Sequence, residues 1–258
     1  MANTVFPNKV IEAKAEDLLT TSLNTRTLMT IDNDLAQNAG MTKTVNLYTY
    51  TGAAEEVAIG KGNTVRGSIS YEGKDYTVKM VQQAFDYFDE DFMKDPTIVD
   101  NMLKGATQTM TNKMTADFIT ACGGATMSLE VAELSYDAVV DAIVEMNVED
   151  ESGLFLVIPT AWKGELRKDP DYKAARMGEV VYNGQVGTVA GIPVIATKAL
   201  TEVGFLMTKE AVELFMKKDV EVEQERDADK RANAVYLRTA YLVALVDATK
   251  IVKISKSA

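Results

Sequence analysis

The sequence contains no histidine, and this absence excludes several large classes of catalytic and metal site. Serine and cysteine triads with a histidine base need an imidazole to take the proton of the nucleophile, and many zinc sites use a histidine nitrogen as ligand. A cytosolic carboxylate-dependent enzyme stays open as a hypothesis because the chain holds clusters of acids. No base, nucleophile and oxyanion donor come together in the sequence, so we expect no enzymatic activity, no catalytic residue and no cofactor.

Cysteine and long apolar runs are also scarce. Cys122 is the only cysteine, so no disulfide can form within the chain, and we expect it to fill space at the end of a helix. No apolar run approaches the roughly 18 residues that cross a bilayer. The first residues lack the pattern of a signal peptide. These absences favour a protein of a reducing cell interior with no membrane partner.

What the chain does contain is an excess of acid and a large apolar fraction. Its net charge is −11, whereas a protein that grips DNA through the phosphates needs clustered lysine and arginine. We therefore expect no sequence-specific binding of nucleic acid. With 258 residues, of which 47% are hydrophobic, the chain can form one large domain or two lobes that share a sheet.

Residues 43–82 predict a long β-hairpin with a glycine-rich tip. Strand-like residues are interrupted by glycines, and Gly60, Lys61 and Gly62 stand where the chain would turn. The spacing fits neither a phosphate-binding loop nor a dinucleotide fingerprint. Because the hairpin has too few apolar residues for a core of its own, we expect it to lie on another surface.

Helices and short strands follow the hairpin. Asp95 as N-cap and Pro96 as first helical residue predict a long helix that runs to Ala121 with one apolar stripe. The other predicted elements are a helix at 135–146 capped by Ser135, a strand at 154–158, a helix at 159–168, a strand pair or bent strand at 188–196, a strand at 204–207 and a helix at 209–216 capped by Thr208.

The last forty residues predict two strands around a charged turn, followed by a third strand. An acidic row occupies every second position of the first strand and consists of Asp219, Glu221, Glu223 and Glu225. Residues 234–246 are β-branched and aromatic enough for a buried strand, and residues 250–254 close the chain. We expect the three strands to form a meander in a sheet where both ends of the chain meet.

This order of elements resembles the major capsid proteins of tailed bacteriophages, which have the Hong Kong 97-type fold. The segments IPTAWKGELRKD and GTVAGIPVIAT, followed by a capped helix and the acidic strand, carry the resemblance, which covers nearly the whole chain. It implies an α+β fold with an N-terminal arm at 1–42, an E-loop hairpin at 43–82, a P-domain with a long spine helix at 83–130, an A-domain at 131–216 and C-terminal strands of the P-domain at 217–258.

The resemblance also implies a function. The chain would be a non-enzymatic shell protein that assembles with itself, as pentamers and hexamers, into an icosahedral head around phage DNA. It would be part of a virion that is assembled in the bacterial cytoplasm. The sequence shows no N-terminal coiled-coil-like segment of the kind that some family members carry as a fused scaffold, so we expect a separate scaffolding protein or none. Portal and decoration proteins are further candidate partners. The alternative is an encapsulin-like bacterial nanocompartment shell, but the arm lacks the amphipathic helix expected of that group.

Ten residues are candidate positions in subunit interfaces: Gly60, Lys61, Gly62, Asp219, Glu221, Glu223, Glu225, Arg226, Lys230 and Arg231. The acidic row would form an electrostatic seam if basic residues of a neighbouring subunit lay opposite it. A solvated strand face and a cation site shared by several subunits are the alternatives. Some members of the family join an E-loop lysine to an asparagine of a neighbour, but no acceptor can be chosen here, so we expect no cross-link from Lys61.

Other side chains have simpler interpretations. Acids at 86, 89, 90, 91 and 95 lack the spacing of a calcium loop, so we expect a solvated approach to the helix and no metal site. Met102, Met110 and Met114 are expected to pack in the core. Trp162 is interpreted either as an interface anchor, together with Arg167, or as a core residue.

Overall fold

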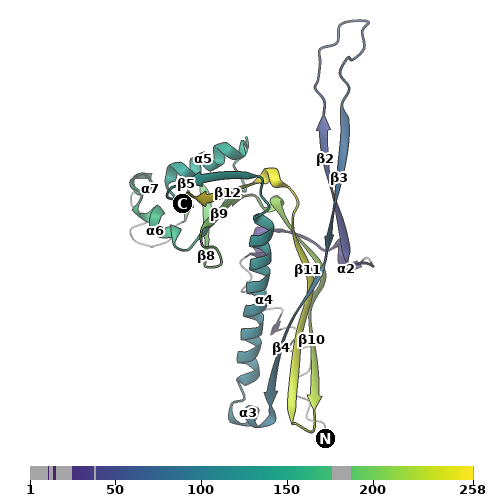
Figure 1. Cartoon of the computed structure of the whole chain (residues 1–258), viewed down its shortest axis with the longest axis vertical. Helices are drawn as coiled ribbons and strands as arrows, with labels where there is room; N and C mark the ends of the chain where they lie inside the picture. The colour runs from purple at the N-terminus through teal and green to yellow at the C-terminus, as the bar shows by residue number, and fades with distance from the viewer. Residues whose placement is uncertain (1–10, 12–13, 16–24, 38, 176–186, 258) are drawn as a thin grey trace.

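The structure, a computed structural model, describes residues 11, 14–15, 25–37, 39–175 and 187–257. Figure 1 shows three parts: a long column of sheet and helix, a lobe at one side of its upper end, and a hairpin that projects beyond both. The mixture of helices and sheets confirms the predicted α+β class.

The column consists of α4 (Ile98–Cys122) packed along a four-stranded sheet. The strand order is β1-β10-β11-β4, in which β1 is parallel to β10 and the other neighbours are antiparallel. The strands of this sheet are β1 (Thr30–Asp32), β4 (Lys79–Phe88), β10 (Val212–Asp227) and β11 (Ala232–Leu245). The 25 residues of α4 span about 37 Å at a rise of ~1.5 Å per residue.

The apolar stripe of α4 explains its position on the sheet. Leu103, Met110, Met114 and Phe118 recur at helical spacing and are buried in one core with residues of β10 and β11. Burying a side chain of this size stabilises the fold by about 1.5–3 kcal/mol. The predicted spine helix is therefore confirmed.

The predicted start of that helix is wrong by two residues. The carboxylate of Asp95 accepts hydrogen bonds from the N–H and hydroxyl of Thr97, at 2.9 and 2.6 Å, and closes a turn before the helix. Thr97 is the N-cap, and Ile98 is the first helical residue. Pro96 therefore lies in the turn and not at the first helical position.

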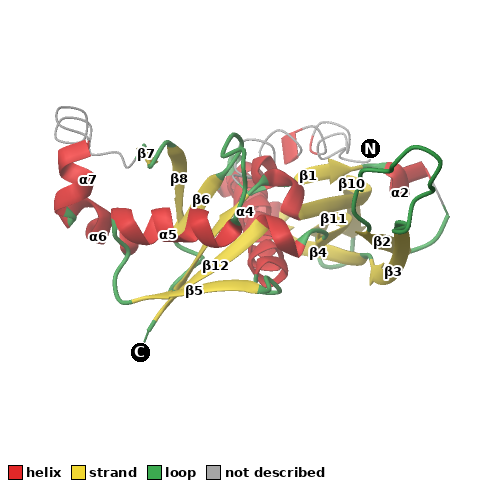
Figure 2. Cartoon of the chain, turned by 90° about the horizontal axis from the view of Figure 1, so that it is seen from above, coloured by secondary structure: helices red, strands yellow, loops and turns green. Residues whose placement is uncertain are grey.

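The lobe is built on a six-stranded sheet with the order β5-β12-β9-β6-β8-β7. Its strands are β5 (Met127–Val131), β6 (Phe155–Pro159), β7 (Thr188–Val189), β8 (Ile192–Thr197), β9 (Val203–Met207) and β12 (Ile251–Lys256). Its helices are α5 (Tyr136–Met146), α6 (Trp162–Lys168) and α7 (Pro170–Ala175), which share a core with one face of the sheet. Residues of the opposite face join the core around α4. Figure 2 shows the three helices in a row.

The predicted core roles of the sulfur-containing residues are confirmed. Met110 and Met114 are buried, and Met102 packs against the same core. Cys122 is fully buried at the end of α4, and burial raises the pKa of its thiol, which keeps it protonated and unreactive. Trp162 is 2% exposed in the core of the lobe, so it does not anchor an interface.

The hairpin consists of β2 (Thr42–Thr51) and β3 (Ser68–Thr77), joined by a loop at 52–67. Its two strands form a separate two-stranded sheet, and its base joins the column through a small core that contains Val78, Phe215 and Ala240. This arrangement confirms the predicted hairpin.

The helix predicted at 209–216 is wrong. Only Lys209–Ala211 is helical, as a short 3-10 turn, and β10 begins at Val212. The backbone of Val212 to Met216 pairs with β11, and four of these five residues are buried. Their burial in a sheet outweighs the helical spacing of the segment, because long-range pairing overrides local propensity.

The predicted C-terminal meander is also wrong. β12 does not pair with β11 but lies between β5 and β9 in the lobe, so the last strand leaves the sheet of β10 and β11. The N-terminal strand β1 pairs with β10, so an N-terminal segment does share a sheet with β10 and β11, and only the last strand lies outside that sheet. The predicted domain boundaries stay a prediction, with β12 in the sheet of the lobe.

Two further elements carry no clear sequence signal: β5 and α3 (Asp89–Lys94). Of the weak periodic pattern at 10–23, only Ile11, Lys14 and Ala15 fall within the described residues. The remaining short elements are η1 (Arg26–Leu28), α2 (Asp34–Gln37), η2 (Lys209–Ala211) and η3 (Ala248–Lys250).

Candidate assembly interfaces

The tip of the hairpin lies far from the rest of the subunit (Figure 1). The N–H of Lys61 donates to the carbonyl of Ala58 at 3.0 Å, and Gly60 has a φ of 82°, which closes a tight turn. Gly60, Lys61 and Gly62 are all exposed. The tip is therefore free to contact another molecule, and its role in an interface stays a prediction.

Below this tip, two contacts hold together the segments 52–55 and 64–67, which we call the neck of the hairpin. Glu55 accepts hydrogen bonds from the N–H and the hydroxyl of Thr64, the latter at 2.6 Å, and these bonds lower the pKa of the Glu55 carboxyl. Gly52 and Gly67 face each other where the strands end, and a Cβ on Gly52 would lie 2.7 Å from the Cα of Gly67. Only glycine allows this approach.

One face of the hairpin carries exposed apolar side chains. Tyr50 pairs with Ile69 across the strands, and Tyr71 lies two residues from Ile69 on the same face. Tyr50 is 61%, Ile69 53% and Tyr71 71% exposed. Ile59 at the tip is also fully exposed. Adjacent apolar side chains on an extended arm indicate a surface that another protein covers.

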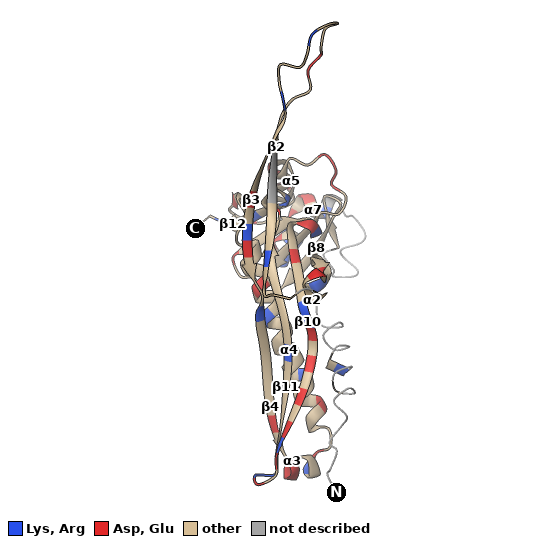
Figure 3. Ribbon diagram, turned by 90° about the vertical axis from the view of Figure 1, so that its right-hand side faces the viewer, with Lys and Arg blue, Asp and Glu red and all other residues tan. Residues whose placement is uncertain are grey.

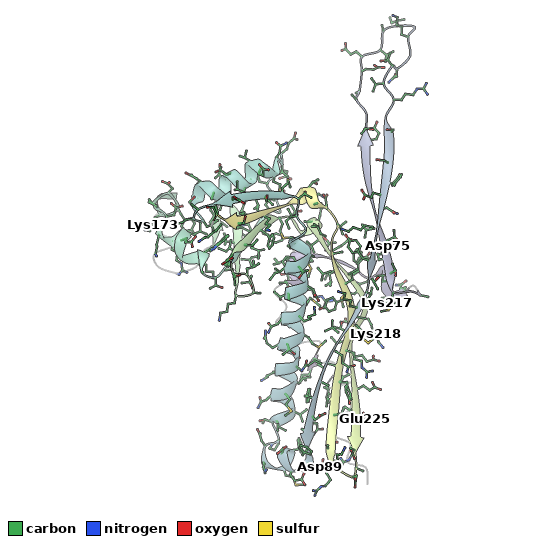
Figure 4. All side chains as sticks on the ribbon, viewed as in Figure 1. Asp75, Asp89, Lys173, Lys217, Lys218 and Glu225 are labelled. Atoms are coloured by element: carbon green, nitrogen blue, oxygen red, sulfur yellow. The ribbon has the colours of Figure 1, made fainter. Side chains whose placement is uncertain are left out.

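Ion pairs fix the base of the hairpin to the column. The Nζ atom of Lys43 lies 3.0 Å from a carboxylate oxygen of Asp32 and 3.6 Å from one of Asp34. We call these three residues the clasp. Lys217 adds a hydrogen bond of 2.8 Å to the carbonyl of Leu35, and Figure 4 shows Lys217 and Lys218 beside the hairpin base.

Electrostatics favour the charged form of the clasp. Hydrogen bonding to Asp32 raises the pKa of Lys43. Burial acts to raise the pKa of Asp32, but hydrogen bonds from the Asp34 N–H and from Lys43 outweigh it, so this pKa is lowered. Sequence reasoning missed the clasp, because Lys43 and Asp32 share no motif and meet where the chain folds back between β1 and β2.

The acidic row lies along β10 as predicted, and Figure 3 shows acidic segments repeated along this strand. Val220 and Val222 face the core, whereas Asp219, Glu223 and Glu225 are exposed. The predicted one-sided strand is confirmed.

Several acids of the row have partners inside the subunit. Glu221 pairs with Lys218 at 2.7 Å, and Glu223 pairs with Arg238 at 2.5 Å. Glu225 accepts a hydrogen bond of 3.4 Å from the hydroxyl of Tyr236. These contacts reduce the repulsion along the row, and the proposed seam with a neighbouring subunit stays a prediction.

The basic residues of the β10–β11 turn also pair within the subunit. Arg226 lies 2.8 Å from Asp89, and Arg231 lies 2.9 Å from Glu90, both acids of α3. Lys230 pairs with Asp227 at 3.1 Å. Asp89 and Glu225 both lie at the lower end of the column in Figure 4. The pairs join the turn to α3, so these cations are already partly neutralised before any neighbour approaches.

Among the described residues, a second strand pairs with the outer edge of β10 over only a short stretch. β1 pairs only with residues 213–215, and beyond Phe215 no second strand among the described residues pairs with this edge. An open edge can join a strand of another chain, and its charged side chains discourage unspecific pairing. The row is therefore well placed to select a partner.

Metal and membrane binding receive no support from the described residues. They contain no group of three or more acids, cysteines or histidines that could hold a metal ion. No described helix is both long and apolar enough for a membrane span.

Comparison with known proteins places the chain among phage capsid proteins. A family model described as "Phage capsid protein" matches residues 71–254, more than half of the chain. The "Major capsid protein" of Staphylococcus phage phiMR11 is 26% identical over 264 residues, which cover 99% of this chain and 94% of that relative.

Solved structures share the fold at low sequence identity. Gordonia phage Cozz aligns with a TM-score of 0.72 at 12% identity and covers 92% of this chain and 87% of that one. The mature capsid of bacteriophage PhiM1 gives 0.68 at 11% identity, with 90% and 86% covered. A virus-like particle from Pyrococcus furiosus gives 0.65 at 11% identity, with 96% and 98% covered. The predicted Hong Kong 97-type fold is confirmed. The chain belongs to the phage capsid protein family.

Proposed function

We propose that copies of this major capsid protein tile a closed icosahedral shell around the DNA genome of a tailed bacteriophage. The observation that carries the proposal is the hairpin, which projects from the subunit with Tyr50, Ile69 and Tyr71 exposed on one face. A two-stranded hairpin is marginal in water unless something covers it. In a shell, the surface of a neighbouring copy provides that cover.

Charge supports the role of a container. At a net charge of −11, the chain as a whole repels DNA, so the enclosed genome would be free to enter and leave. The match to the phage capsid family and to a major capsid protein supports a structural role without catalysis, in a virion that would be assembled in the host cytoplasm. Scaffolding, portal and decoration proteins would be the further partners.

Assembly of the full chain tests the proposal. We expect the protein, expressed in bacteria, to sediment as capsomers or shells, and electron microscopy to show closed particles. A compact monomer of 28.2 kDa that persists at high concentration would contradict self-assembly.

The contents of the particles distinguish a phage head from a nanocompartment. Particles recovered from cells that also express the phage packaging proteins should protect DNA from nuclease. Particles that enclose a protein cargo and no DNA would instead favour an encapsulin-like compartment of the same fold.

A further inference from the structure

A cavity of about 600 Å³ lies in the corner between the lobe and the column, where β8 is close to the second half of α4 (Figure 1). Its volume is within the range of roughly 300–1,000 Å³ that is typical of ligand sites in proteins. The lining residues come from α4, from Thr25 and Leu28 at η1, and from β6, β8 and the residues just after β8. None of them belongs to the hairpin, the acidic row or the β10–β11 turn. We call this cavity the corner site.

The lining of the corner site combines apolar side chains with polar groups that can form further hydrogen bonds. Leu28, Phe118 and Val157 line it and are buried in the core around α4. Gln108 and Asn112 line it from α4, and the amide nitrogen of Gln108 donates to the side-chain oxygen of Asn112 at 3.1 Å. This bond leaves the amide nitrogen of Asn112 as a donor and the amide oxygen of Gln108 as an acceptor. A ligand with both apolar and amide groups fits such a lining.

The charge of the corner site is opposite to that of the whole chain. Lys198 is the one charged residue in the lining, is exposed and forms no ion pair with a described residue. The chain has 38 acidic and 27 basic residues, yet no carboxylate lines the cavity. An acidic ligand therefore meets a cation in the lining and no carboxylate, so charge complementarity favours such a ligand.

The outer edge of β8 supplies backbone groups to the same cavity. The N–H of Val194 donates to the carbonyl of Gly187 at 3.0 Å, on the β7 side of β8, whereas the carbonyl of Thr197 accepts from the N–H of Thr160, which follows β6. Backbone groups alternate between the two sides along a strand, so Ala196 turns its N–H and C=O to the β7 side, as Val194 does. β7 pairs only with the first two residues of β8, so no described strand lies beside Ala196 on that side.

A free strand edge beside a pocket is a known way to bind an extended peptide. The edge gives backbone hydrogen bonds, and the pocket takes alternate side chains of the added strand. We propose that the corner site binds an extended segment of another protein, in which acidic and apolar residues alternate, and that this segment adds to β8 at Ala196. An acidic side chain of the segment then pairs with Lys198, and an apolar side chain lies against Phe118.

The occupant is a separate protein and not a second copy of this chain. The chain has one alternating acidic and apolar segment of this kind, residues 219–225, but Val220 and Val222 of that segment are buried in the core of their own subunit. They are therefore not available to another copy. The inference rests on the proposed function, since it names the chemistry by which the shell protein recognises a partner such as a separate scaffolding protein.

Binding of a designed peptide tests the charge of the site. The probe is a fluorescent peptide of sequence Glu-Val-Glu-Val-Glu with both ends blocked, and fluorescence anisotropy measures its affinity for the full chain. We expect Lys198→Glu to weaken binding at least about tenfold. Lys168→Glu is the matched control, because it makes the same change at an exposed position of the lobe outside the cavity, and it should bind like the wild type. Equal affinities of Lys198→Glu and wild type would overturn the inference.

Methylated peptides test the addition of a strand without any change to the protein. Two probes carry an N-methyl group, one on the central residue of the peptide and one on the next residue. Because the N–H groups of a strand alternate between its two sides, one methylated peptide should bind at least about tenfold more weakly, and the other should bind like the parent. Ala196→Pro removes the facing donor on β8, where an edge strand tolerates proline, and should also weaken binding. Two methylated peptides that bind like the parent would overturn the pairing with β8.

The outcomes for the corner site and for the shell function can be told apart. A wild-type chain that assembles but binds none of the peptides overturns the corner site and leaves the shell function intact. A chain that binds the peptide through Lys198 and never assembles contradicts the shell function and leaves the corner site intact. A peptide that binds through Lys198 and blocks assembly would overturn the choice of a separate protein, because a second copy would then occupy the cavity.

Discussion

At the scale of single residues, Glu213 of β10 lies near the clasp in a position that is unfavourable for its own charge. Burial raises the pKa of this carboxyl, and the nearby charges of Asp32 and Asp34 raise it further, against the opposing effect of Lys43. The folded state therefore binds the proton of Glu213 more tightly than the unfolded chain does.

The sign of this shift gives a pH-dependent prediction. A charged Glu213 destabilises the subunit at pH values above its raised pKa, and this penalty is absent below the unfolded value of 4.5. Glu213→Gln should raise the melting temperature of the subunit by about 1–2 °C at pH 7 and leave it unchanged at pH 4. Calorimetry at the two pH values measures the difference. Equal shifts of the melting temperature at both pH values would show that the charge of Glu213 is not the cause.

Glycine at the neck of the hairpin is a second point where one residue decides the local structure. In Gly52→Ala, the new methyl group would lie 2.7 Å from the Cα of Gly67, so the strand ends must separate. We expect a subunit with normal circular dichroism but a several-fold loss of particle yield, since the hairpin above the neck is redirected. Gly105→Ala is the control, because a Cβ there meets nothing within 4 Å and the residue lies in α4, outside the hairpin. Equal yields from both variants would contradict a role for the neck.

At the scale of elements, β12 joins the end of the chain to the lobe. Its residues Val252 and Ile254 are fully buried in the lobe core, which also contains Trp162. Because Trp162 is the only tryptophan, its fluorescence reports on the lobe.

The position of β12 predicts which substitution weakens the lobe. Ile254→Ala should lower the free energy of unfolding by about 2–4 kcal/mol, because it leaves a cavity in a packed core. Denaturant titration followed by Trp162 emission measures this loss. Lys253→Ala, at the intervening position that is only partly buried, should cost less than about 1 kcal/mol. An unshifted Trp162 transition in Ile254→Ala would mean that β12 does not stabilise the lobe.

At the scale of the whole molecule, the hairpin is joined to the column near its base, whereas its tip projects away from the rest of the subunit. Its loop contributes nothing to the three cores formed by the buried residues. We expect this loop to acquire its stabilising contacts from another copy, so substitutions in it should affect assembly more than folding.

Deleting the tip tests this separation. A chain without Gly60–Asn63 should unfold at the same denaturant concentration as the wild-type subunit, while its shells should dissociate at lower denaturant or temperature. Lys61→Ala should give shells that dissociate in hot detergent as the wild type does. Covalent ladders in the wild type that vanish in this variant would contradict the absence of a cross-link.

The acidic row gives a prediction about the salt dependence of assembly. Replacing Glu223 and Glu225 with glutamine should change the stability of the subunit by less than about 1 kcal/mol, because exposed ion pairs contribute little. If the row meets cations of a neighbour, the variant should assemble with a weaker dependence on salt concentration. Light scattering at ionic strengths from low to high measures this salt dependence of assembly. The same yield as wild type at every salt concentration would leave the row as a solvated face.

The sequence by itself determined the features that depend on residues close together in the chain. The Ser135 cap of α5 forms as predicted, with its hydroxyl accepting from the N–H of Ala138 at 3.1 Å. The apolar stripe of α4, the hairpin turn at Gly60 and the alternation along β10 are equally local, because 3.6-residue and two-residue periods follow from backbone geometry. The order of elements was sufficient to show the resemblance to phage capsid proteins, and that resemblance implied a shell protein.

Only the tertiary structure decided which strands pair and which charges meet. Residues 212–216 have the spacing of a helix, and they become a strand because β11 supplies hydrogen-bond partners and a buried face. β12 could have paired with β11 as the third strand of a meander, where it would have had one neighbour. It lies instead in the sheet of the lobe, where it pairs with two strands, β5 and β9. In the clasp, Lys43 contacts Asp32. At the β10–β11 turn, Arg226 contacts Asp89, which lies 137 residues earlier in the chain. Such pairings depend on the packing of the whole chain, and no local pattern encodes them.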